Sequence, residues 1–179
     1  MLPWRDWYHC TSNTYGTWLP GDPRGFRTKG DRFHVDGDYK NPPARGMYEG
    51  MHVMARRRMK REAVVLTPEM QVVARAAVVE KLIEKDIELA AVAVDDHHLH
   101  VLGRFPDHRP RHWIGLAKKH SAFVVRKAGC WPGGGIWAQR GLCKPIVDEG
   151  HLRRAREYVL DHLQRGALVW KAGTRVGEG

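Results

Sequence analysis

Residues 87–105, IELAAVAVDDHHLHVLGRF, contain two short apolar runs separated by a polar cluster. Residues 87–94 have the length and apolar content of a β-strand, and residues 98–105 resume as a second strand. The polar residues 95–97 lie between the two runs and provide the turn. This stretch therefore predicts a β-hairpin whose tip lies beside two histidines.

Three segments outside this hairpin carry helix signals. Thr67 is a suitable N-cap, and apolar residues follow it at helical spacing. A second helix is predicted from about Arg111 to near Gly129. A third is predicted from its cap at Asp148 to a stop at Gly166.

Two further strands complete the pattern. Residues 4–15 are rich in aromatic and β-branched side chains, and residues 136–148 have strand character interrupted by Gly141 and Pro145. The resulting order is strand, helix, two strands, helix, strand, helix. It predicts an α+β fold of the ferredoxin-like sandwich type, with helices packed on one face of a mixed or antiparallel sheet.

The length of 179 residues fits one domain that carries a long insertion. Residues 16–50 are dominated by Gly, Pro, Asp and Asn, which predicts a long loop inserted after the first strand. We therefore expect a single domain over residues 1–170 and a loose C-terminal tail over residues 171–179.

The net charge of +10 arises from 30 Lys and Arg residues against 20 Asp and Glu residues. Such an excess favours a polyanionic partner, and nucleic acid is the partner that we expect, although charge alone also fits a ribosome, an anionic membrane or a soluble protein without such a partner. The candidate phosphate-binding residues are Arg56, Arg57, Arg58, Lys60, Arg61, Lys118, Lys119 and Arg165. For the basic residues of the second predicted helix, a solvated face is an equally good interpretation.

The sequence carries no sign of a membrane or secreted protein. Its N-terminal stretch lacks the apolar core of a secretory signal, and no segment approaches the roughly 20 apolar residues of a membrane span. Cys10, Cys130 and Cys143 are odd in number and far apart, which predicts reduced thiols rather than a disulfide framework or a zinc site. We therefore expect a cytoplasmic protein with no membrane partner.

His98 and His100 are separated by one residue in a predicted strand, so their side chains point to the same face. Two neighbouring imidazoles on a rigid strand can bind one divalent ion. The pair alone is not diagnostic, because exposed or hydrogen-bonded histidines also occur at this spacing.

The third predicted helix adds a hydroxyl group and another imidazole. Tyr158 and His162 are four residues apart and therefore lie on the same flank of the helix, with Arg165 about two turns along the same stripe. The apolar positions expected to face the core are Leu152, Ala155, Val159 and Leu163. Taken alone, a surface tyrosine and a solvated histidine would also fit. Combined with the strand histidines and the basic charge, the helix predicts a nucleophile beside a metal.

Two segments resemble a known enzyme family. Residues 95–105, DDHHLHVLGRF, resemble the His–hydrophobic–His (HUH) signature of single-tyrosine DNA transposases. Residues 156–169, REYVLDHLQRGALV, resemble the catalytic-tyrosine helix of these enzymes and are most similar to the REP-associated tyrosine transposases. The resemblance covers roughly residues 4–15 and 62–170.

This resemblance implies a metal-dependent single-stranded DNA endonuclease and strand transferase. Tyr158 would be the nucleophile that forms a covalent 5′-phosphotyrosine, and His98, His100 and His162 would hold the metal. In the family the position of His162 is commonly Gln or Asn, so Mg²⁺ and Mn²⁺ both stay open, with an all-nitrogen site favouring Mn²⁺. The implied partner is single-stranded or hairpin DNA, and the family includes monomers and homodimers.

Other hydrolase classes fit the histidines less well. Histidine-triad hydrolases need a third histidine where this chain has Leu102, and two-histidine phosphoesterases need a hydroxyl residue after each histidine motif. The HExxH pattern of zinc proteases is absent. The alternative that stays open is a domesticated nucleic-acid-binding protein on the same fold, without transposition activity.

Overall fold

The computed structural model describes residues 4–24, 26 and 44–176, which divide into two compact units. The sheet unit comprises the described residues of Met1–Thr14 and Val65–Gly179, and the α1 unit comprises those of Tyr15–Val64. Most of the predicted insertion, residues 25 and 27–43, lies outside the described residues, as do residues 177–179 of the predicted tail.

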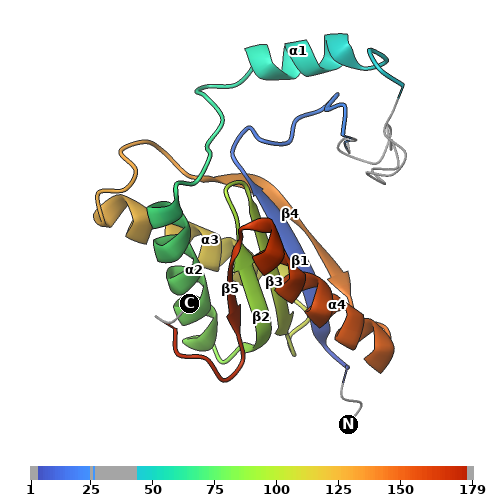
Figure 1. Cartoon of the computed structure of the whole chain (residues 1–179), viewed down its shortest axis with the longest axis vertical. Coiled ribbons are helices and arrows are strands. Elements are labelled where there is room, and N and C mark those ends of the chain that lie inside the picture. The colour runs from blue at the N-terminus through green and yellow to red at the C-terminus, as the bar shows by residue number, and fades with distance from the viewer. Residues whose placement is uncertain (1–3, 25, 27–43, 177–179) are drawn as a thin grey trace. The chain divides into compact units, whose positions relative to one another are not determined.

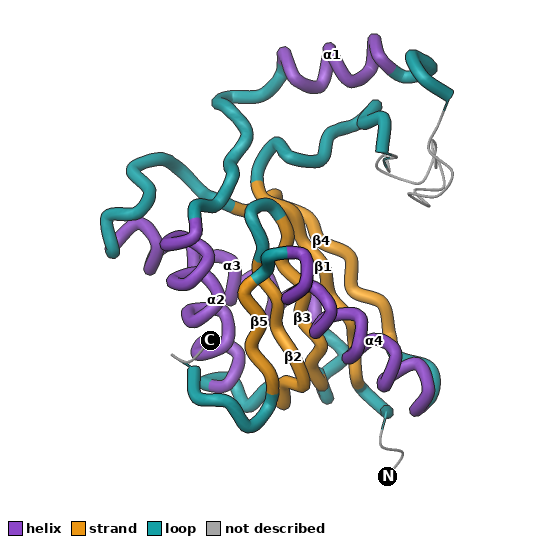
Figure 2. The backbone as a smooth tube through the Cα atoms, viewed as in Figure 1, coloured by secondary structure: helices purple, strands orange, loops and turns teal. Residues whose placement is uncertain are grey.

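The sheet unit is built on a five-stranded antiparallel sheet with the order β4-β1-β3-β2-β5 (Figures 1 and 2). Its strands are β1 (Trp7–Thr14), β2 (Glu88–Val94), β3 (His98–Arg104), β4 (Trp137–Pro145) and β5 (Leu168–Lys171). The predicted α+β class with an antiparallel sheet is confirmed. The strand with the histidine pair, β3, occupies the centre of the sheet.

β2 and β3 form the predicted hairpin, and Asp95 stabilises its turn. The Asp95 carboxylate accepts hydrogen bonds from the backbone N–H groups of His97, at 2.8 Å, and of His98. Aspartate commonly closes turns by accepting from the amides that follow it. The turn therefore fixes the point at which His98 begins β3.

The predicted helices are present as α2 (Pro68–Ile83), α3 (Pro110–Lys127) and α4 (Glu149–Asp161). The hydroxyl of Thr67 accepts from the N–H of Met70 at 3.3 Å. The carboxylate of Asp148 accepts from the N–H of His151 at 2.6 Å, so both predicted N-caps are confirmed. None of the described helices is long and apolar enough to cross a membrane.

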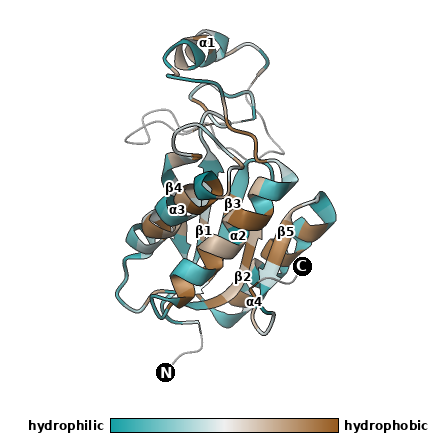
Figure 3. Ribbon diagram, turned by 90° about the vertical axis from the view of Figure 1, so that its left-hand side faces the viewer, coloured by the Kyte–Doolittle hydropathy of each residue, from teal (hydrophilic) through white to brown (hydrophobic). Residues whose placement is uncertain are grey.

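The helices cover both faces of the sheet rather than one (Figures 1 and 3). α4 packs on one face through a cluster that joins Ala155 and Val159 to Trp7, Ala91 and Leu102 of the strands. α2 and α3 cover the opposite face. The prediction that helices lie on a single face is wrong, because strand order does not determine the side on which a connection crosses. The last four residues of β2 are all buried, as a strand covered on both faces requires.

The edge strand β5 was not predicted. It has four residues and pairs with β2, so it is too short to show an alternating pattern in the sequence. Its Trp170 is buried, and the indole N–H donates to the carbonyl oxygen of Thr174 at 2.9 Å. The buried Arg75 of α2 donates to the carbonyl oxygen of the preceding residue, Val169, at 3.1 Å.

Cys10 and Cys143 form a disulfide bond between β1 and β4. The two residues are direct partners in the antiparallel register, so their side chains meet although 133 residues separate them. The prediction of reduced thiols is wrong for this pair, because spacing along the chain carries no information on which strands are neighbours. Cys130 is a free cysteine.

The α1 unit contains the helix α1 (Glu49–Arg57), against which the described part of the insertion packs. Gly21 has a φ of +82°, and a Cβ atom there would lie 2.4 Å from the backbone nitrogen of His52 and 2.6 Å from the carbonyl oxygen of Tyr48. Only glycine fits so close to a helix backbone in this conformation. Nearby, the Arg24 Nε donates to the Asp22 carboxylate at 2.9 Å. The predicted loop is therefore locally ordered around this turn.

Candidate metal and nucleophile site

β3 and the C-terminal part of α4 bring the predicted site residues together. The ring centroid of His100 lies 5.7 Å from that of Tyr158 and 4.2 Å from that of His162. The Tyr158 and His162 rings are separated by 4.8 Å. His98, two residues before His100 on the same strand face, has its ring centroid 6.2 Å from that of His100. The four side chains are thus neighbours on the α4 face of the sheet.

The site combines sheltered imidazoles with an accessible phenol. His100 is 7% exposed and His162 is 5% exposed, whereas Tyr158 is 44% exposed. A large substrate such as a nucleic-acid strand can therefore reach the tyrosine without entering the core. The histidines beside it are held by the packing of the sheet and helix.

The Nδ1 atoms of the β3 histidines each face a defined partner. His98 Nδ1 lies 3.3 Å from the Asp95 carboxylate, and His100 Nδ1 lies 3.2 Å from Nε2 of His9. When Nδ1 donates in such a pair, the tautomer is selected whose Nε2 carries the lone pair. That is the form in which a histidine binds a metal through Nε2.

His162 lies where α4 tightens into a 3₁₀ turn, His162–Arg165, that ends at Gly166 with a φ of 85°. Its Nδ1 is 2.8 Å from the carbonyl oxygen of Tyr158, one turn earlier. The prediction that Leu163 faces the core is wrong, since this side chain is 64% exposed while His162 is buried. The tighter turn changes which position faces inward. All three predicted ligands thus have Nδ1 engaged by a neighbour.

Burial keeps two of the clustered histidines neutral. Burial, reinforced by the nearby His162, lowers the pKa of His100 to about 2 and the pKa of His9 to about 4. Neutral imidazole is the form that binds metal ions. Burial would raise the pKa of Asp95, but hydrogen bonds from the His98 side chain and from the backbone lower it to about 2. His98 therefore faces an ionised carboxylate.

Among the described residues, the group whose possible ligand atoms come together closely enough to hold a divalent ion is Asp95, His97 and His98, whereas His98, His100 and His162 are not placed so closely. One ligand atom from each residue lies within 4.8 Å of the others. The rings of His97 and His98 have centroids 4.2 Å apart, and His97 Nδ1 contacts the carboxylate of Asp96. This group shares His98 with the predicted set, but its other members come from the hairpin turn instead of α4.

Two residues beside the site were not predicted. His9 of β1 stacks on His100 with ring centroids 5.4 Å apart, and its ring lies 5.7 Å from that of Tyr158. Lys144 of β4 is exposed and is the direct strand partner of His9, and its charge contributes to the lowered pKa of His9. Alternation along β1 could have placed His9 on one face. Its neighbours became known only with the pairing of β1 with β3 and β4.

The predicted phosphate-binding residues are distributed over both units. Those exposed at the surface are Arg56, Arg57, Arg58, Lys60, Lys119 and Arg165. The guanidinium of Arg61 lies 4.3 Å from the centroid of the Tyr15 ring. Arg165 lies beside the predicted nucleophile: its guanidinium pairs with Asp161 at 3.1 Å and lies 5.9 Å from the Tyr158 ring centroid.

Lys118 differs from the other predicted basic residues because it is buried. Only 7% of it is exposed, and its ammonium group donates to the carbonyl oxygen of Ala138 at 2.6 Å. It joins α3 to β4. A phosphate at the surface would not reach this charge, so we leave Lys118 out of the DNA contacts proposed below.

We expect the buried Lys118 to make stability depend on pH. Burial lowers the pKa of Lys118 from 10.5 to about 8. Between these values the unfolded chain binds a proton that the folded chain lacks, so the free energy of unfolding rises with pH, by up to about 3 kcal/mol for this group. Urea unfolding at about pH 7.5 and about pH 9.5 measures the rise. The free energy of unfolding of Lys118→Met should rise less over this pH range. An equal rise in both proteins would show that Lys118 is not the source of the pH dependence.

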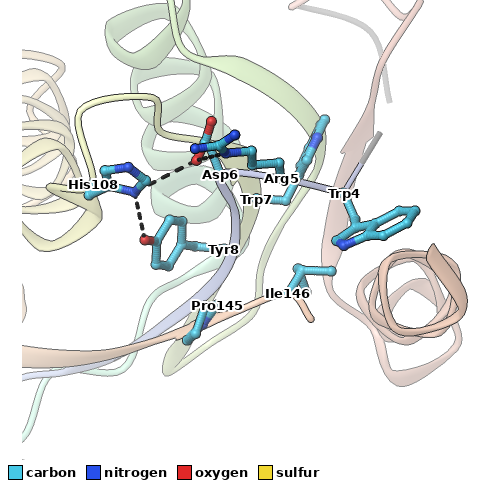
Figure 4. Close-up of a pocket in the computed structure, with 8 residues that line it drawn as sticks. All are labelled: Trp4, Arg5, Asp6, Trp7, Tyr8, His108, Pro145 and Ile146. Atoms are coloured by element: carbon cyan, nitrogen blue, oxygen red, sulfur yellow. Dashed lines mark hydrogen bonds and ion pairs between the residues drawn. The ribbon is translucent and has the colours of Figure 1, made fainter. Parts of the chain in front are cut away.

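A hollow of about 390 Å³ lies at the start of β1 and is lined by none of the predicted site residues (Figure 4). The Tyr8 hydroxyl lies 3.3 Å from Nδ1 of His108 at its edge, and the same nitrogen lies 3.7 Å from the Asp6 carboxylate. The residues that the sequence predicts to carry the chemistry therefore lie in the histidine cluster and not at this hollow.

Comparison with known proteins bears on the fold. No family model and no curated protein matches the sequence. A solved structure of a REP-associated tyrosine transposase bound to a REP hairpin matches with a TM-score of 0.50. The match covers 90% of this chain and 68% of that chain at 16% sequence identity. The chain therefore has a fold similar to that of a REP-associated tyrosine transposase, as its resemblance to that family predicts.

Proposed function

We propose that this protein is a metal-dependent endonuclease and strand transferase that acts on single-stranded or hairpin DNA, as a transposase does. The observation that carries the proposal is the exposed phenol of Tyr158 beside the buried His100 and His162, with ring centroids 5.7 and 4.8 Å away. The similar fold of a transposase bound to a DNA hairpin supports the choice of substrate.

We assign a divalent metal to His98, His100 and His162. The assignment is supported by the partners at Nδ1: His98 and His162 each face an oxygen acceptor, which leaves the lone pair on Nε2, and Nδ1 of His100 can donate to His9 with the same result. A bound divalent ion would polarise the phosphate and balance the charge that grows on its oxygens. Three nitrogen ligands favour Mn²⁺ over Mg²⁺, and both are candidates.

Residues of the chain itself carry out the covalent step. The Tyr158 oxygen attacks phosphorus, the bond from phosphorus to the 3′-oxygen breaks, and the phenolic proton ends on the released 3′-hydroxyl. The product is a 5′-phosphotyrosine, and attack on it by another 3′-hydroxyl joins two strands without ATP. Arg165 and Lys144, which lie beside Tyr158 and His9 respectively, supply positive charge for the phosphate.

One chain supplies every residue assigned to this chemistry. The strand histidines and the helix tyrosine belong to the same sheet unit. We propose that residues 1–170 act as one endonuclease unit, to which the exposed arginines of α1 contribute DNA contacts. A monomer is therefore sufficient for nicking, and a homodimer is compatible with it.

A labelled-oligonucleotide assay tests this function. The protein is incubated with single-stranded or hairpin DNA, labelled at either end, in Mn²⁺, Mg²⁺ or EDTA. We expect a metal-dependent covalent adduct that survives denaturing electrophoresis and carries the 3′-terminal label, and a nucleotide on Tyr158 by mass spectrometry. DNA binding without any adduct in either metal would overturn the proposal and favour a domesticated binding protein.

We expect Arg57→Gln to weaken DNA binding to a similar extent for all sequences. Arg57 is exposed in the last turn of α1, among other basic residues. Loss of one phosphate contact should lower the slope of log affinity against log salt by about 0.7 for a single strand. Fluorescence anisotropy over a KCl series measures this slope. The control Lys85→Gln removes an exposed charge that pairs with Glu84 at 2.9 Å and should leave the slope unchanged. Equal slopes in all three proteins would remove Arg57 from the DNA interface.

A further inference from the structure

His9 joins the histidine cluster from a neighbouring strand. In the register of β1 with β3, Thr11 pairs with His100 and His9 pairs with Leu102, so His9 and His100 are diagonal neighbours on one face. Their rings stack with planes inclined by 22°. Nε2 of His9 lies 3.2 Å from Nδ1 of His100, within hydrogen-bonding distance.

A hydrogen bond between two neutral imidazoles has two possible directions, because each ring has one donor and one acceptor nitrogen. When His100 donates from Nδ1, its lone pair is on Nε2. When His9 donates instead, the lone pair of His100 on Nδ1 is occupied and its Nε2 carries the proton. Only the first direction leaves His100 able to bind a metal.

The partners of the other two ligands cannot reverse in this way. His98 faces the Asp95 carboxylate and His162 faces the carbonyl oxygen of Tyr158, and both oxygens are acceptors only. The Asp95 carboxylate and the Tyr158 carbonyl oxygen therefore hold His98 and His162 in the tautomer whose Nε2 can bind a metal. For His100 the outcome depends on the tautomer of His9.

We infer that His9 is a positioning residue whose Nε2 accepts the Nδ1 proton of His100 and so holds His100 in its metal-binding tautomer. The inference rests on the proposed function, because it presupposes the metal assigned to His98, His100 and His162. It adds a requirement that β1 must satisfy, namely an acceptor at residue 9. A residue that merely filled the space beside His100 would not meet this requirement.

Two substitutions separate hydrogen bonding from packing. His9→Phe keeps a planar ring to stack on His100 but removes the acceptor. His9→Gln offers a side-chain carbonyl oxygen at a similar distance from the backbone and restores the acceptor. We expect His9→Phe to weaken Mn²⁺ binding about 10- to 100-fold, as loss of an outer partner of a metal ligand usually does. His9→Gln should stay within about threefold of the wild type, as expected for a variant that keeps this outer partner.

The experiment has two readouts on the full chain. Isothermal titration with Mn²⁺ gives the affinities, and ¹⁵N NMR of the histidine rings in metal-free protein gives the tautomer of His100. We expect Nδ1 of His100 to be protonated in the wild type and in His9→Gln, and the other tautomer to become populated in His9→Phe. Circular dichroism verifies that each variant is folded.

The possible results distinguish this inference from the proposed function. Equal Mn²⁺ affinity in wild type and in folded His9→Phe would overturn the inference, as would a wild-type His100 protonated at Nε2. If His9→Phe does not fold, the tautomer of His100 in the wild type and in His9→Gln still tests the inference. If the wild type binds no Mn²⁺, the proposed metal site fails, while the NMR readout still shows whether His9 sets the tautomer.

Discussion

We expect Tyr158→Phe to abolish the covalent protein–DNA adduct and to slow nicking by about 10⁴-fold or more. The substitution removes one oxygen, which is the atom assigned to attack phosphorus. The remaining ring can still pack beside His9 and His162, at centroid distances of 5.7 and 4.8 Å. DNA affinity should therefore change little, because phosphate contacts from basic side chains dominate it. Single-turnover cleavage of a labelled hairpin and anisotropy with the same DNA measure the two effects.

Tyr8→Phe is the matched control for this loss. Tyr8 belongs to the same sheet unit, and its hydroxyl lies near Nδ1 of His108 rather than in the histidine cluster. This variant should form the adduct at the wild-type rate. An adduct of undiminished yield in Tyr158→Phe would assign the nucleophile to another residue, and the proposed mechanism would then be untenable.

Replacement of a metal ligand should have the second largest effect. We expect His100→Leu and His162→Leu each to weaken Mn²⁺ binding by more than about 100-fold, since loss of an outer partner alone costs about 10- to 100-fold. Leucine is similar in volume to histidine, so the two buried positions stay filled and the fold should persist. Isothermal titration measures the affinity, and nicking should decline in parallel because the ion stabilises the charge on the phosphate.

His97→Leu distinguishes the two possible ligand groups. His97 belongs to the group with Asp95 and His98 at the hairpin tip, but not to the set that includes His162. We expect this variant to bind Mn²⁺ within about threefold of the wild type, because it removes neither a proposed ligand nor one of the ligands' outer partners. The opposite pattern, with binding lost in His97→Leu and kept in His162→Leu, would move the metal to the hairpin turn.

The parts of this protein that sequence predicts well are those specified locally. The hairpin around Asp95 follows from two apolar runs and a turn residue whose carboxylate accepts from the next amides. The third helix follows from its cap at Asp148 and its stop at Gly166. Because a step of two residues in a strand or four in a helix returns a side chain to the same face, the His98–His100 and Tyr158–His162 pairs follow as well.

The features that sequence did not reveal depend on which distant segments meet. His9 and the Cys10–Cys143 disulfide result from the pairing of β1 with β3 and β4, and no local pattern specifies that register. The same limit explains Lys118, which the sequence suggests as a phosphate-binding residue but which is buried and donates to the carbonyl oxygen of Ala138 of β4. Sequence periodicity identifies a face of an element, whereas the tertiary fold determines what covers it.

The hydrogen bond from His162 to the carbonyl oxygen of Tyr158 links the proposed nucleophile to a proposed metal ligand through a single helical turn. One residue inserted between them would rotate everything beyond it by about 100° around the helix axis. The imidazole would then lose both its backbone acceptor and its place beside His100. The number of residues between Tyr158 and His162 therefore cannot change without separating the proposed nucleophile from the proposed metal ligand, and Val159 among them must also stay apolar because it is buried against the sheet.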